Sequence, residues 1–309
     1  MPRHFLGQND LSAEEMVGIF TRAAHLKKHK HSRDLESQTL VMFFEKASTR
    51  TRLSFEIGMT QLGGHAVYLD HESSQLSRGE SVADMARVVS RYADLMMARV
   101  YQHQTLVDLA THSTIPVING LSDEEHPCQS MTDMFTILER RGSIGGLRIA
   151  YVGDGQNNVT HSLMLAAALL GAELHVAAPP ALQPEQRYVD VATGLADRSG
   201  GSVDIGDDPR AAVEEANVVY TDVWVSMGRE DERQARLDLL RPYQVNDELL
   251  SGAAPDHLFM HCLPAHVGEE VTGDVLYGDR SIVFEQAENR LHVQKALMLF
   301  LLNPNHEGE

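Results

Sequence analysis

Short apolar runs alternate with amphipathic segments along most of the chain. A capping box, in which Ser12 is followed three residues later by Glu15, and the helical spacing of Met16, Ile19 and Phe20 predict a first helix. Strands are then predicted at residues 39–44, 66–69, 95–101 and 116–121, and helices at 51–62 and 81–92. This alternation predicts parallel βαβ units with helices on both faces of a sheet.

A second series of the same kind follows a segment that contains three glycines. A helix that begins near Pro127 ends in residues 140–146, and the glycines there suit a junction between two domains. Further strands are predicted at residues 148–153, 172–178, 217–224 and 257–263, and a final helix at 288–302. We therefore expect an α/β fold with two doubly wound domains, residues 1–141 joined by 288–309 and residues 142–287, each with a mostly parallel sheet flanked by helices.

Composition narrows the classes of partner. The 309 residues carry 26 Lys and Arg against 44 Asp and Glu, a net charge of −18, which makes nucleic acid and anionic membranes poor partners. No apolar run approaches the roughly 20 residues that span a bilayer, and the N-terminus lacks the apolar core of a signal peptide. Two cysteines, Cys128 and Cys262, cannot build a disulfide framework. We expect a cytoplasmic protein.

A group of hydroxyl and guanidinium side chains begins the second predicted helix. Because it follows a strand, free backbone N–H groups and the positive end of the helix dipole point at one spot. Ser48, Thr49 and Thr51 add hydroxyl donors and Arg50 a planar fork, so a tetrahedral phosphate could be held on several sides. The alternative is a helix cap with solvated arginines. Two arginines and three hydroxyls within five residues of an acidic protein favour the anion site.

The run Ser-Thr-Arg-Thr-Arg at residues 48–52 resembles the carbamoyl phosphate signature of the aspartate and ornithine carbamoyltransferase superfamily. Matches to that superfamily extend over essentially the whole chain. The resemblance implies that Arg99 contacts phosphate and the carbonyl oxygen, that His126 donates to the carbonyl oxygen, and that Gln129 binds the carbamoyl nitrogen. It also implies that Arg290, in the closing motif, reaches the carbamoyl group.

A polar loop that begins at Gln75 resembles the superfamily loop that enters the neighbouring subunit's site. The residues alone predict only a polar turn. The resemblance implies that Gln75 contacts phosphate there and that the site is completed in an oligomer, a homotrimer or a multiple of trimers. Ala47 departs from the superfamily, in which this position is often proline, asparagine or a bulkier residue; the change affects the shape of the loop and removes no donor.

The second half of the chain carries residues that would select the acceptor. The run 220–228 resembles the acceptor loop of the ornithine branch, which implies that Asp222 and Ser226 hold the ornithine α-ammonium and that Met227 lies beside it. Asn158 would hold the α-carboxylate. The alternative is a strand end followed by a surface turn.

The run His-Cys-Leu-Pro-Ala-His at residues 261–266 also resembles the ornithine branch. It implies that Cys262 lies near the reactive amine and that the Leu263 carbonyl helps to hold both substrates, carbamoyl phosphate and L-ornithine. A cysteine in such a position is more often a buried hydrophobe than a reactive thiol. We therefore expect Cys262 to position the amine and handle its proton, without forming a covalent intermediate.

The implied reaction joins carbamoyl phosphate and L-ornithine to give L-citrulline and phosphate, in arginine metabolism, where we expect a role in synthesis. The acceptor amine has an ordinary pKa of about 10.4, so it must lose a proton before it attacks. Because carbamoyl phosphate is already activated, neither a metal nor an organic cofactor is expected. The catalytic residues are expected to be Arg50, Arg99, His126, Asp222, Cys262 and Arg290.

The sequence also admits other interpretations. A dinucleotide-binding fingerprint at Gly153 and Gly155 lacks its third glycine, because Asn158 stands there. Zinc binding by residues 261–266, or by the histidines of residues 25–31, lacks the paired-cysteine spacing of a structural site. A carbamoyltransferase for acetylornithine, putrescine or aspartate, and a non-catalytic anion-binding relative, remain alternatives.

Overall fold

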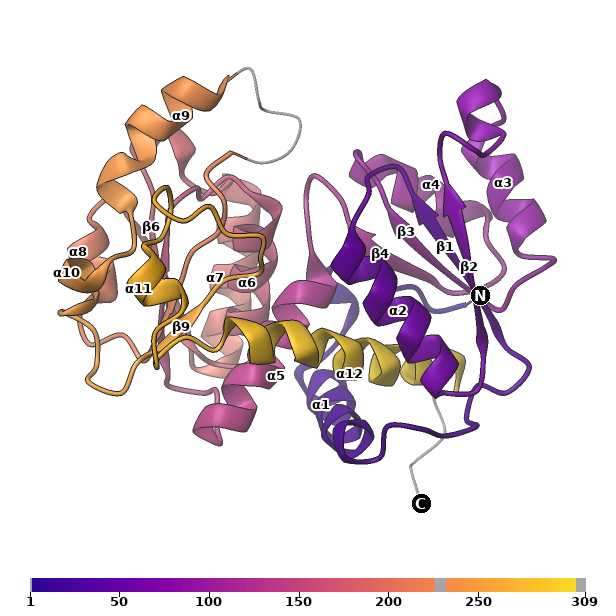
Figure 1. Cartoon of the computed structure of the whole chain (residues 1–309), viewed down its shortest axis with the longest axis horizontal. Helices are drawn as coiled ribbons and strands as arrows, with labels where there is room; N and C mark the ends of the chain where they lie inside the picture. Colours follow the sequence, from indigo (N-terminus) through magenta and orange to yellow (C-terminus); the bar gives the residue numbers. More distant parts are fainter. Residues whose placement is uncertain (1, 226–231, 304–309) are drawn as a thin grey trace. The chain divides into compact units, whose positions relative to one another are not determined.

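Two parallel sheets organise the chain. The computed structural model describes residues 2–225 and 232–303. The chain divides into two compact units, Met1–Phe135 with Glu288–Glu309, called unit 1 below, and Thr136–Ala287, called unit 2. Each unit has a sheet flanked by helices, which confirms the predicted α/β fold class (Figure 1). Among the described residues, no helix is both long enough and apolar enough to cross a membrane.

Unit 1 contains a four-stranded sheet in the order β2-β1-β3-β4, with every neighbouring pair parallel. Its strands are β1 (Thr39–Phe44), β2 (His65–Asp70), β3 (Leu95–Arg99) and β4 (Val117–Leu121). Its helices are η1 (Gln8–Asp10), α1 (Ala13–Lys28), α2 (Thr49–Gln61), η2 (Leu76–Arg78), α3 (Val82–Val89) and α4 (His103–His112), and it shares α5 (Pro127–Arg141) and α12 (Val283–Leu302) with unit 2. The four predicted strands are therefore present.

The two faces of this sheet are covered by different helices. Val41 and Phe43 of β1 pack in one buried cluster with Met85 of α3 and Leu106 of α4. Alternate strand residues point to the opposite face. Figure 1 shows α3 and α4 on one side of the strands and α2 and α12 on the other. The predicted capping box of α1 is confirmed, because the hydroxyl of Ser12 accepts from the Glu15 backbone and the Glu15 carboxylate accepts from the Ser12 backbone.

Unit 2 contains a five-stranded parallel sheet in the order β7-β6-β5-β8-β9. Its strands are β5 (Arg148–Val152), β6 (Glu173–Ala177), β7 (Ser202–Gly206), β8 (Val218–Tyr220) and β9 (Leu258–Met260). Its helices are α6 (Asn158–Leu169), η3 (Pro180–Leu182), α7 (Gln186–Ser199), α8 (Pro209–Val213), α9 (Arg233–Leu240), η5 (Arg241–Tyr243), α10 (Asp247–Leu250) and α11 (Gly273–Leu276). Figure 1 shows α6 and α7 on one side of this sheet and α8, α10 and α11 on the other.

Both strand orders contain a point at which the winding reverses. In unit 1 the chain moves outward from β1 to β2 and then returns to β3, so β1 and β3 are neighbours at the switch point. In unit 2 the same relation holds between β5 and β8. Ligands of open α/β sheets bind beyond the carboxyl ends of the strands at such points. A ligand-binding site is therefore expected in the segments that follow these four strands.

Candidate functional site

The helix that follows β1 begins with a hydroxyl cap. Ser48 is the N-cap residue of α2, and its Oγ accepts a hydrogen bond of 3.3 Å from the Thr51 backbone N–H. The same Oγ donates to Thr51 Oγ1 at 3.1 Å. These bonds hold both hydroxyls at the positive end of a helix of 13 residues, where an anion is stabilised.

An arginine from the last helix completes this cluster. Arg290 of α12 donates from Nη2 to Thr51 Oγ1 at 2.8 Å, and the two side chains are almost completely buried. Thr51 Oγ1 therefore accepts from both Arg290 and Ser48. Since a hydroxyl oxygen has two lone pairs, the proton of Thr51 itself is directed away from these partners and can be donated to a ligand.

Glu45 fixes the loop between β1 and α2. Its backbone N–H donates to the Arg99 carbonyl at 2.9 Å, and its Oε2 accepts from the Tyr101 N–H at 2.8 Å. Arg99 is itself only 6% exposed and lies where the pairing of β3 with β4 shifts register after Ala98. Irregular pairing of this kind turns a side chain away from the regular alternation. Sequence reasoning did not find this role of Glu45, although the residue stands beside the signature.

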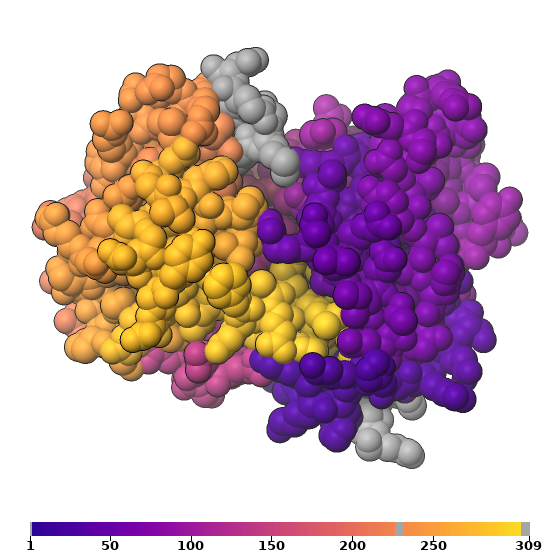
Figure 2. Space-filling view, in the orientation of Figure 1, coloured from indigo at the N-terminus to yellow at the C-terminus, as the bar shows by residue number. Residues whose placement is uncertain are grey.

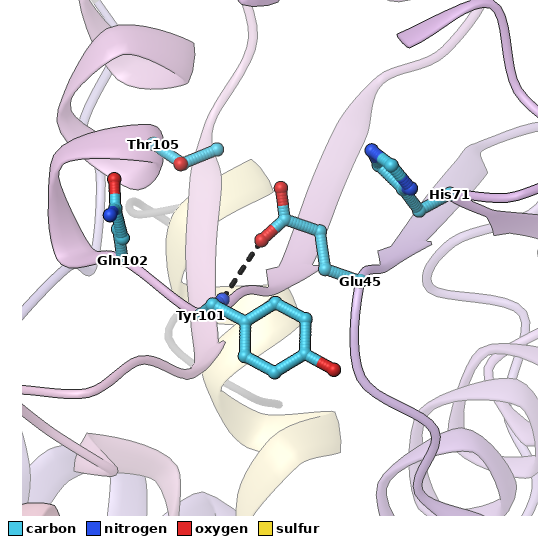
Figure 3. Close-up of a pocket in the computed structure, with 5 residues that line it drawn as sticks. All are labelled: Glu45, His71, Tyr101, Gln102 and Thr105. Atoms are coloured by element: carbon cyan, nitrogen blue, oxygen red, sulfur yellow. Dashed lines mark hydrogen bonds between the residues drawn. The ribbon is translucent and has the colours of Figure 1, made fainter. Parts of the chain in front are cut away.

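A pocket of about 220 Å³ lies beside Glu45 in unit 1. Glu45, His71, Tyr101, Gln102 and Thr105 line it, and they follow the carboxyl ends of β1, β2 and β3. Figure 3 shows the Glu45 carboxylate turned toward the Tyr101 backbone nitrogen, with His71 and Gln102 on opposite sides of it. The Glu45 carboxylate at this pocket already accepts the Tyr101 N–H, so it serves to hold the loop.

His126 directly precedes Pro127, the first residue of α5. The side chain is buried. Burial first, and then the positive charges of Arg290, Arg99 and Arg50, hold the pKa of His126 well below its usual range. His126 is therefore neutral near pH 7 and can donate only one N–H. Because the charges of all three arginines lower the pKa of His126, these arginines lie close to its imidazole.

Gln129 lies one turn further along α5. Its Nε2 donates to Asp133 Oδ1 at 2.8 Å, and both residues are buried. Cys128, between His126 and Gln129, has its Sγ directed to the Asn119 carbonyl at 3.3 Å. Burial raises the pKa of the Cys128 thiol to about 12, so this cysteine is a packing residue.

Other members of the predicted donor site differ in exposure. Thr49 is exposed and Arg50 half-buried at the start of α2. Gln75 is exposed as the N-cap residue of η2. Arg52 lies apart from the cluster: its guanidinium is 4.1 Å from the Tyr68 ring centroid, and its Nε donates to Glu56 at 3.0 Å. Of the two arginines in the signature, Arg52 is therefore held on the outer face of α2.

In unit 2 the segments after β8 and β9 bring two predicted residues together. Cys262 Sγ donates to Asp222 Oδ1 at 3.0 Å. Asp222 is 5% exposed and Cys262 is half-buried. Asp222 follows β8 at the switch point of this sheet, and Cys262 follows the adjacent β9. A buried carboxylate beside a thiol offers an anion and a polarisable surface to a cationic ligand.

Leu263 is held in an unusual backbone conformation by its neighbours. Its φ is +59°, in the left-handed region that side chains other than glycine rarely adopt. The Leu263 N–H donates to His261 Nδ1 at 2.8 Å, so the imidazole carries its proton on Nε2, which lies 3.2 Å from Glu270 Oε1. His261 and Glu270 are buried. Such a conformation persists where the surroundings enforce it, as they do here.

The structure describes some of the other residues that were predicted to bind the acceptor. Asn158 is the first residue of α6 and is half-buried, whereas Asn157 is the buried N-cap, whose side chain accepts from the Thr160 backbone. Ser226 and Met227 lie outside the described residues. Gly155, in the segment before α6, has close backbone neighbours: a Cβ there would lie 2.7 Å from the Leu182 carbonyl oxygen. Packing of the loop thus accounts for this glycine, which the dinucleotide interpretation would assign to a pyrophosphate.

A buried ion pair in unit 2 was not predicted from the sequence. Arg236 of α9 forms an ion pair with Asp154, and each side chain is 5% exposed or less. Arg236 Nε also donates to the Trp224 carbonyl at 3.1 Å. The pair therefore joins the segment after β5 to the segment after β8. Nothing in the local pattern around Arg236 distinguishes it from Arg233, which forms a partly exposed ion pair with Glu269. Most residues of α9 are exposed, and the helix lies at the surface of unit 2 (Figure 2).

Two side-chain groups in unit 2 have the donor atoms of a metal site. One consists of Asp222, His261 and Cys262, and the other of His266, Glu269 and Glu270; within each group the donor atoms lie within 4.8 Å of one another. In the first group both nitrogens of His261 already serve hydrogen bonds, so a metal would have to displace one of them. The second group contains Glu269, which is paired with an arginine.

Comparison with known proteins agrees with these features. Residues 3–139 match the family model described as aspartate/ornithine carbamoyltransferase, carbamoyl-P binding domain, and residues 145–301 match the model described as its Asp/Orn binding domain. A curated relative from Pyrococcus furiosus, named ornithine carbamoyltransferase, anabolic, is 51% identical over 304 residues, which cover 97% of this chain and 96% of the relative.

Solved structures show the same similarity. The ornithine carbamoyltransferase from Pyrococcus furiosus superposes with a TM-score of 0.93 at 51% identity, with 96% of each chain covered. An acetylornithine transcarbamylase complexed with acetylcitrulline superposes with a TM-score of 0.88 at 30% identity, with 96% of this chain and 98% of that chain covered. The fold is therefore shared by proteins named for different acceptors. On both the sequence and the structural comparison, the chain belongs to the aspartate/ornithine carbamoyltransferase family.

Proposed function

We propose that this protein transfers the carbamoyl group of carbamoyl phosphate to the side-chain amine of L-ornithine, releasing L-citrulline and phosphate. The observation that carries the proposal is the hydrogen bond between Asp222, which follows β8 at the switch point of unit 2, and Cys262, which follows the adjacent strand β9. Members of the family share the donor, so the acceptor has to be assigned from this second group. A carboxylate with a thiol beside it can bind an amine that enters the site in its protonated, cationic form.

The donor half of the site suits a small phosphate ester. The helix start with Ser48, Thr49 and Thr51, together with Arg50, would hold the phosphate. The Thr51 proton, the Arg99 guanidinium and the neutral His126 would donate to the carbonyl oxygen. Charge grows on that oxygen during attack, and fixed donors stabilise it there without reorganisation.

The acceptor half of the site would hold the amino acid and prepare its amine. Asp222 and Ser226 would bind the ornithine α-ammonium, Met227 would lie beside it, and Asn158 would bind the α-carboxylate. Cys262 would lie beside the side-chain amine. Removal of water around that amine favours its neutral form.

The reaction then proceeds with a simple balance of atoms. The neutral amine nitrogen attacks the carbamoyl carbon, the new C–N bond forms, and the C–O bond to phosphate breaks. The proton lost by the amine passes to the leaving phosphate or to water. The Leu263 carbonyl and the guanidinium of Arg290 would hold the carbamoyl group while this happens. Every residue in this sequence of events is supplied by the protein, and no cofactor takes part.

The proposal extends to assembly, location and pathway. We propose a homotrimer, or a multiple of trimers, in which the exposed Gln75 of one subunit contacts phosphate in the next. The protein would act in the cytoplasm, in keeping with the absence of a membrane-spanning helix among the residues described. A role in arginine synthesis is supported by the relative whose name includes the word anabolic.

Initial rates with four acceptors test the proposed activity. Carbamoyl phosphate is held constant, and L-ornithine, N-acetylornithine, putrescine and L-aspartate are compared by phosphate release and by the mass of the product. We expect kcat/KM for ornithine to exceed the others by roughly 100-fold or more, because a site with buried polar groups rejects ligands that leave them unpaired. Equal or higher kcat/KM with another acceptor contradicts the assignment. Absence of turnover with all four supports a non-catalytic relative.

Mixing of two inactive variants tests the shared site. Gln75→Ala and Asp222→Asn each damage every site of a homotrimer. If sites are shared between subunits, refolding the two together places an intact Gln75 beside an intact Asp222 in some sites. Activity should then reappear in the mixture and not in either variant refolded alone. A mixture as inactive as its components would show that Gln75 serves its own subunit or none.

A further inference from the structure

We propose that Asp133 is a positioning residue that makes the donor site select a carbamoyl over an acetyl group. It does so by fixing the side-chain amide of Gln129 with its oxygen, not its nitrogen, toward the bound acyl phosphate. The inference rests on the proposed function and deepens it. In this inference the Asp133 carboxylate determines which acyl phosphate is bound, and it does so through the side chain of Gln129.

The two residues form a buried pair on one helix. Gln129 and Asp133 are four residues apart on α5, so their side chains lie on the same face. Gln129 Nε2 donates to Asp133 Oδ1 at 2.8 Å. Gln129 is 1% exposed and Asp133 is 0% exposed. Water therefore does not compete for this hydrogen bond, which is stronger in such surroundings than at the surface.

The pairing settles which way the Gln129 amide points. A primary amide has one side that accepts and one side that donates. With the nitrogen held by Asp133, the oxygen has to point to the other side. Gln129 Oε1 is buried, and no group in residues 2–225 or 232–303 donates to it. A buried acceptor without a donor is unfavourable, so this oxygen is suited to receive an N–H from a ligand.

Carbamoyl phosphate and acetyl phosphate differ in the group that would face the Gln129 amide oxygen. Both have a phosphate and a carbonyl oxygen, and they differ in the third substituent of the acyl carbon, NH₂ against CH₃. An amide oxygen gains a hydrogen bond from NH₂ and stays unsatisfied beside CH₃. If Gln129 were reversed, its own NH₂ would face the carbamoyl NH₂ and neither could accept. Asp133 thus determines whether Gln129 favours or opposes the carbamoyl group.

Two unreactive phosphonates isolate this effect from turnover. Phosphonoacetamide carries NH₂, and 2-oxopropylphosphonate carries CH₃ in the same position; the two are otherwise alike. Their binding to the full-length protein is measured by calorimetry, with inorganic phosphate as a third ligand. The wild-type protein should bind phosphonoacetamide more tightly by roughly 10- to 100-fold. If it binds both phosphonates equally, the inference is wrong while the phosphate site stands.

The variant Asp133→Asn tests the positioning role. Asparagine can donate as well as accept, so Gln129 is no longer held in one orientation. The preference for phosphonoacetamide should fall to about threefold or less, while binding of inorganic phosphate stays within about twofold of wild type. An unchanged preference overturns the inference. Should the variant not fold, Asp133→Ser carries the same expectation, because serine also donates and accepts.

A matched control separates positioning from general damage to α5. Ser130 lies on the same helix, is 1% exposed and donates at 2.8 Å to Gln8 Oε1. Ser130→Ala removes a buried hydrogen bond of the same length without touching the Gln129 pair. It should lower stability and keep the preference; loss of preference in this variant would overturn the specific role of Asp133. If the wild-type protein binds neither phosphonate nor phosphate, the proposed function itself fails.

Discussion

Arg290 donates a hydrogen bond of 2.8 Å to the hydroxyl oxygen of Thr51, although the two residues are 239 positions apart in the chain. Ser48 donates to the same oxygen. The last helix therefore contributes more than a positive charge to the start of α2. By occupying a lone pair, Arg290 helps to direct the Thr51 proton toward the space in which an anion would bind.

Removal of the Thr51 hydroxyl should lower turnover while leaving the fold intact. Thr51→Val keeps the shape of the side chain and removes the donor, and kcat should fall by roughly 10²- to 10³-fold, the usual effect of losing one donor to a developing oxyanion. Thr51→Ser keeps a hydroxyl and should stay within about tenfold of wild type. Citrulline formation under saturating substrates measures both. A value for Thr51→Val close to that for Thr51→Ser would show that the hydroxyl is not used as a donor.

The two arginines of the signature should respond differently to substitution. Arg50 is one of the charges that lower the pKa of His126, whereas Arg52 lies against Tyr68 and Glu56. Arg50→Ala should reduce kcat/KM for carbamoyl phosphate by roughly 10²-fold or more. Arg52→Ala, two residues along the same helix, should stay within about threefold, because exposed ion pairs contribute little. Near-normal citrulline synthesis by Arg50→Ala would contradict the phosphate assignment.

Burial of His126 predicts a dependence of stability on pH. Its pKa is held well below the ordinary value in the folded protein, so the unfolded chain binds more protons below about pH 6.5. Stability is therefore unaffected by this group above that pH and is lost as the pH falls below it. Between pH 7.0 and 5.5 the loss should be about 1 kcal/mol.

The variant His126→Gln isolates this contribution. Glutamine does not titrate, so the free energy of unfolding should fall less steeply between pH 7.0 and 5.5 than in the wild type. Urea unfolding at the two pH values gives the comparison. His175→Gln serves as a control. The His175 imidazole is half-buried, and burial lowers its pKa to a smaller degree, so this substitution should change the pH dependence less. Identical pH dependence in wild type and His126→Gln would show that His126 keeps an ordinary pKa.

The sequence predicted the strands better than the connections between them. Alternating apolar runs located β1, β3 and β5, because buried parallel strands are continuous apolar segments. It did not predict β7, in which exposed polar residues such as Ser202 and Asp204 interrupt the apolar run. The strand predicted through Trp224 ends at Tyr220, because the side chain of Thr221 donates to the Val152 carbonyl at 2.6 Å and the chain leaves the sheet there.

Candidate site residues could be proposed from the sequence where they belong to a local run, and not where they act through distant partners. The run from Ser48 to Thr51 forms its own cap, so neighbouring residues define it. The roles of Glu45, Asp133 and Arg236 depend on which side chains the fold brings to them. Local spacing carries no information on such partners, and the three residues have the ordinary appearance of charged groups on a helix or loop.

The two cysteines should differ in reactivity toward alkylating reagents. Burial raises the pKa of Cys128 to about 12, so almost no thiolate forms near pH 8. Cys262 is half-buried and hydrogen-bonded to Asp222. Iodoacetamide should therefore modify Cys262 alone in the folded protein, and an adduct there should block ornithine turnover. Peptide mass spectrometry locates the adduct, and Cys262→Ser should remain unmodified until it is unfolded. Modification of Cys128 at a similar rate would contradict its burial.

The buried pair of Arg236 and Asp154 should contribute strongly to the stability of unit 2. Removing one partner leaves an uncompensated charge in an apolar setting, and such losses are typically about 3–5 kcal/mol. Arg236→Met should show a loss of this size in urea unfolding. Arg233→Ala, which removes a surface pair from the same helix, should change stability by about 1 kcal/mol or less.

A double variant distinguishes the charge effect from loss of packing. Arg236→Met combined with Asp154→Asn removes both charges, so it should be more stable than Arg236→Met alone by about 1–3 kcal/mol. Arg236 also donates to the carbonyl of Trp224, two residues after Asp222. Both Arg236→Met and the double variant lack this hydrogen bond, so the KM for ornithine should be abnormal in both. The KM for carbamoyl phosphate should stay within about threefold of wild type, since the pair lies in the other unit. If KM for ornithine is unchanged in Arg236→Met, the bond to Trp224 stabilises the unit without positioning the acceptor loop.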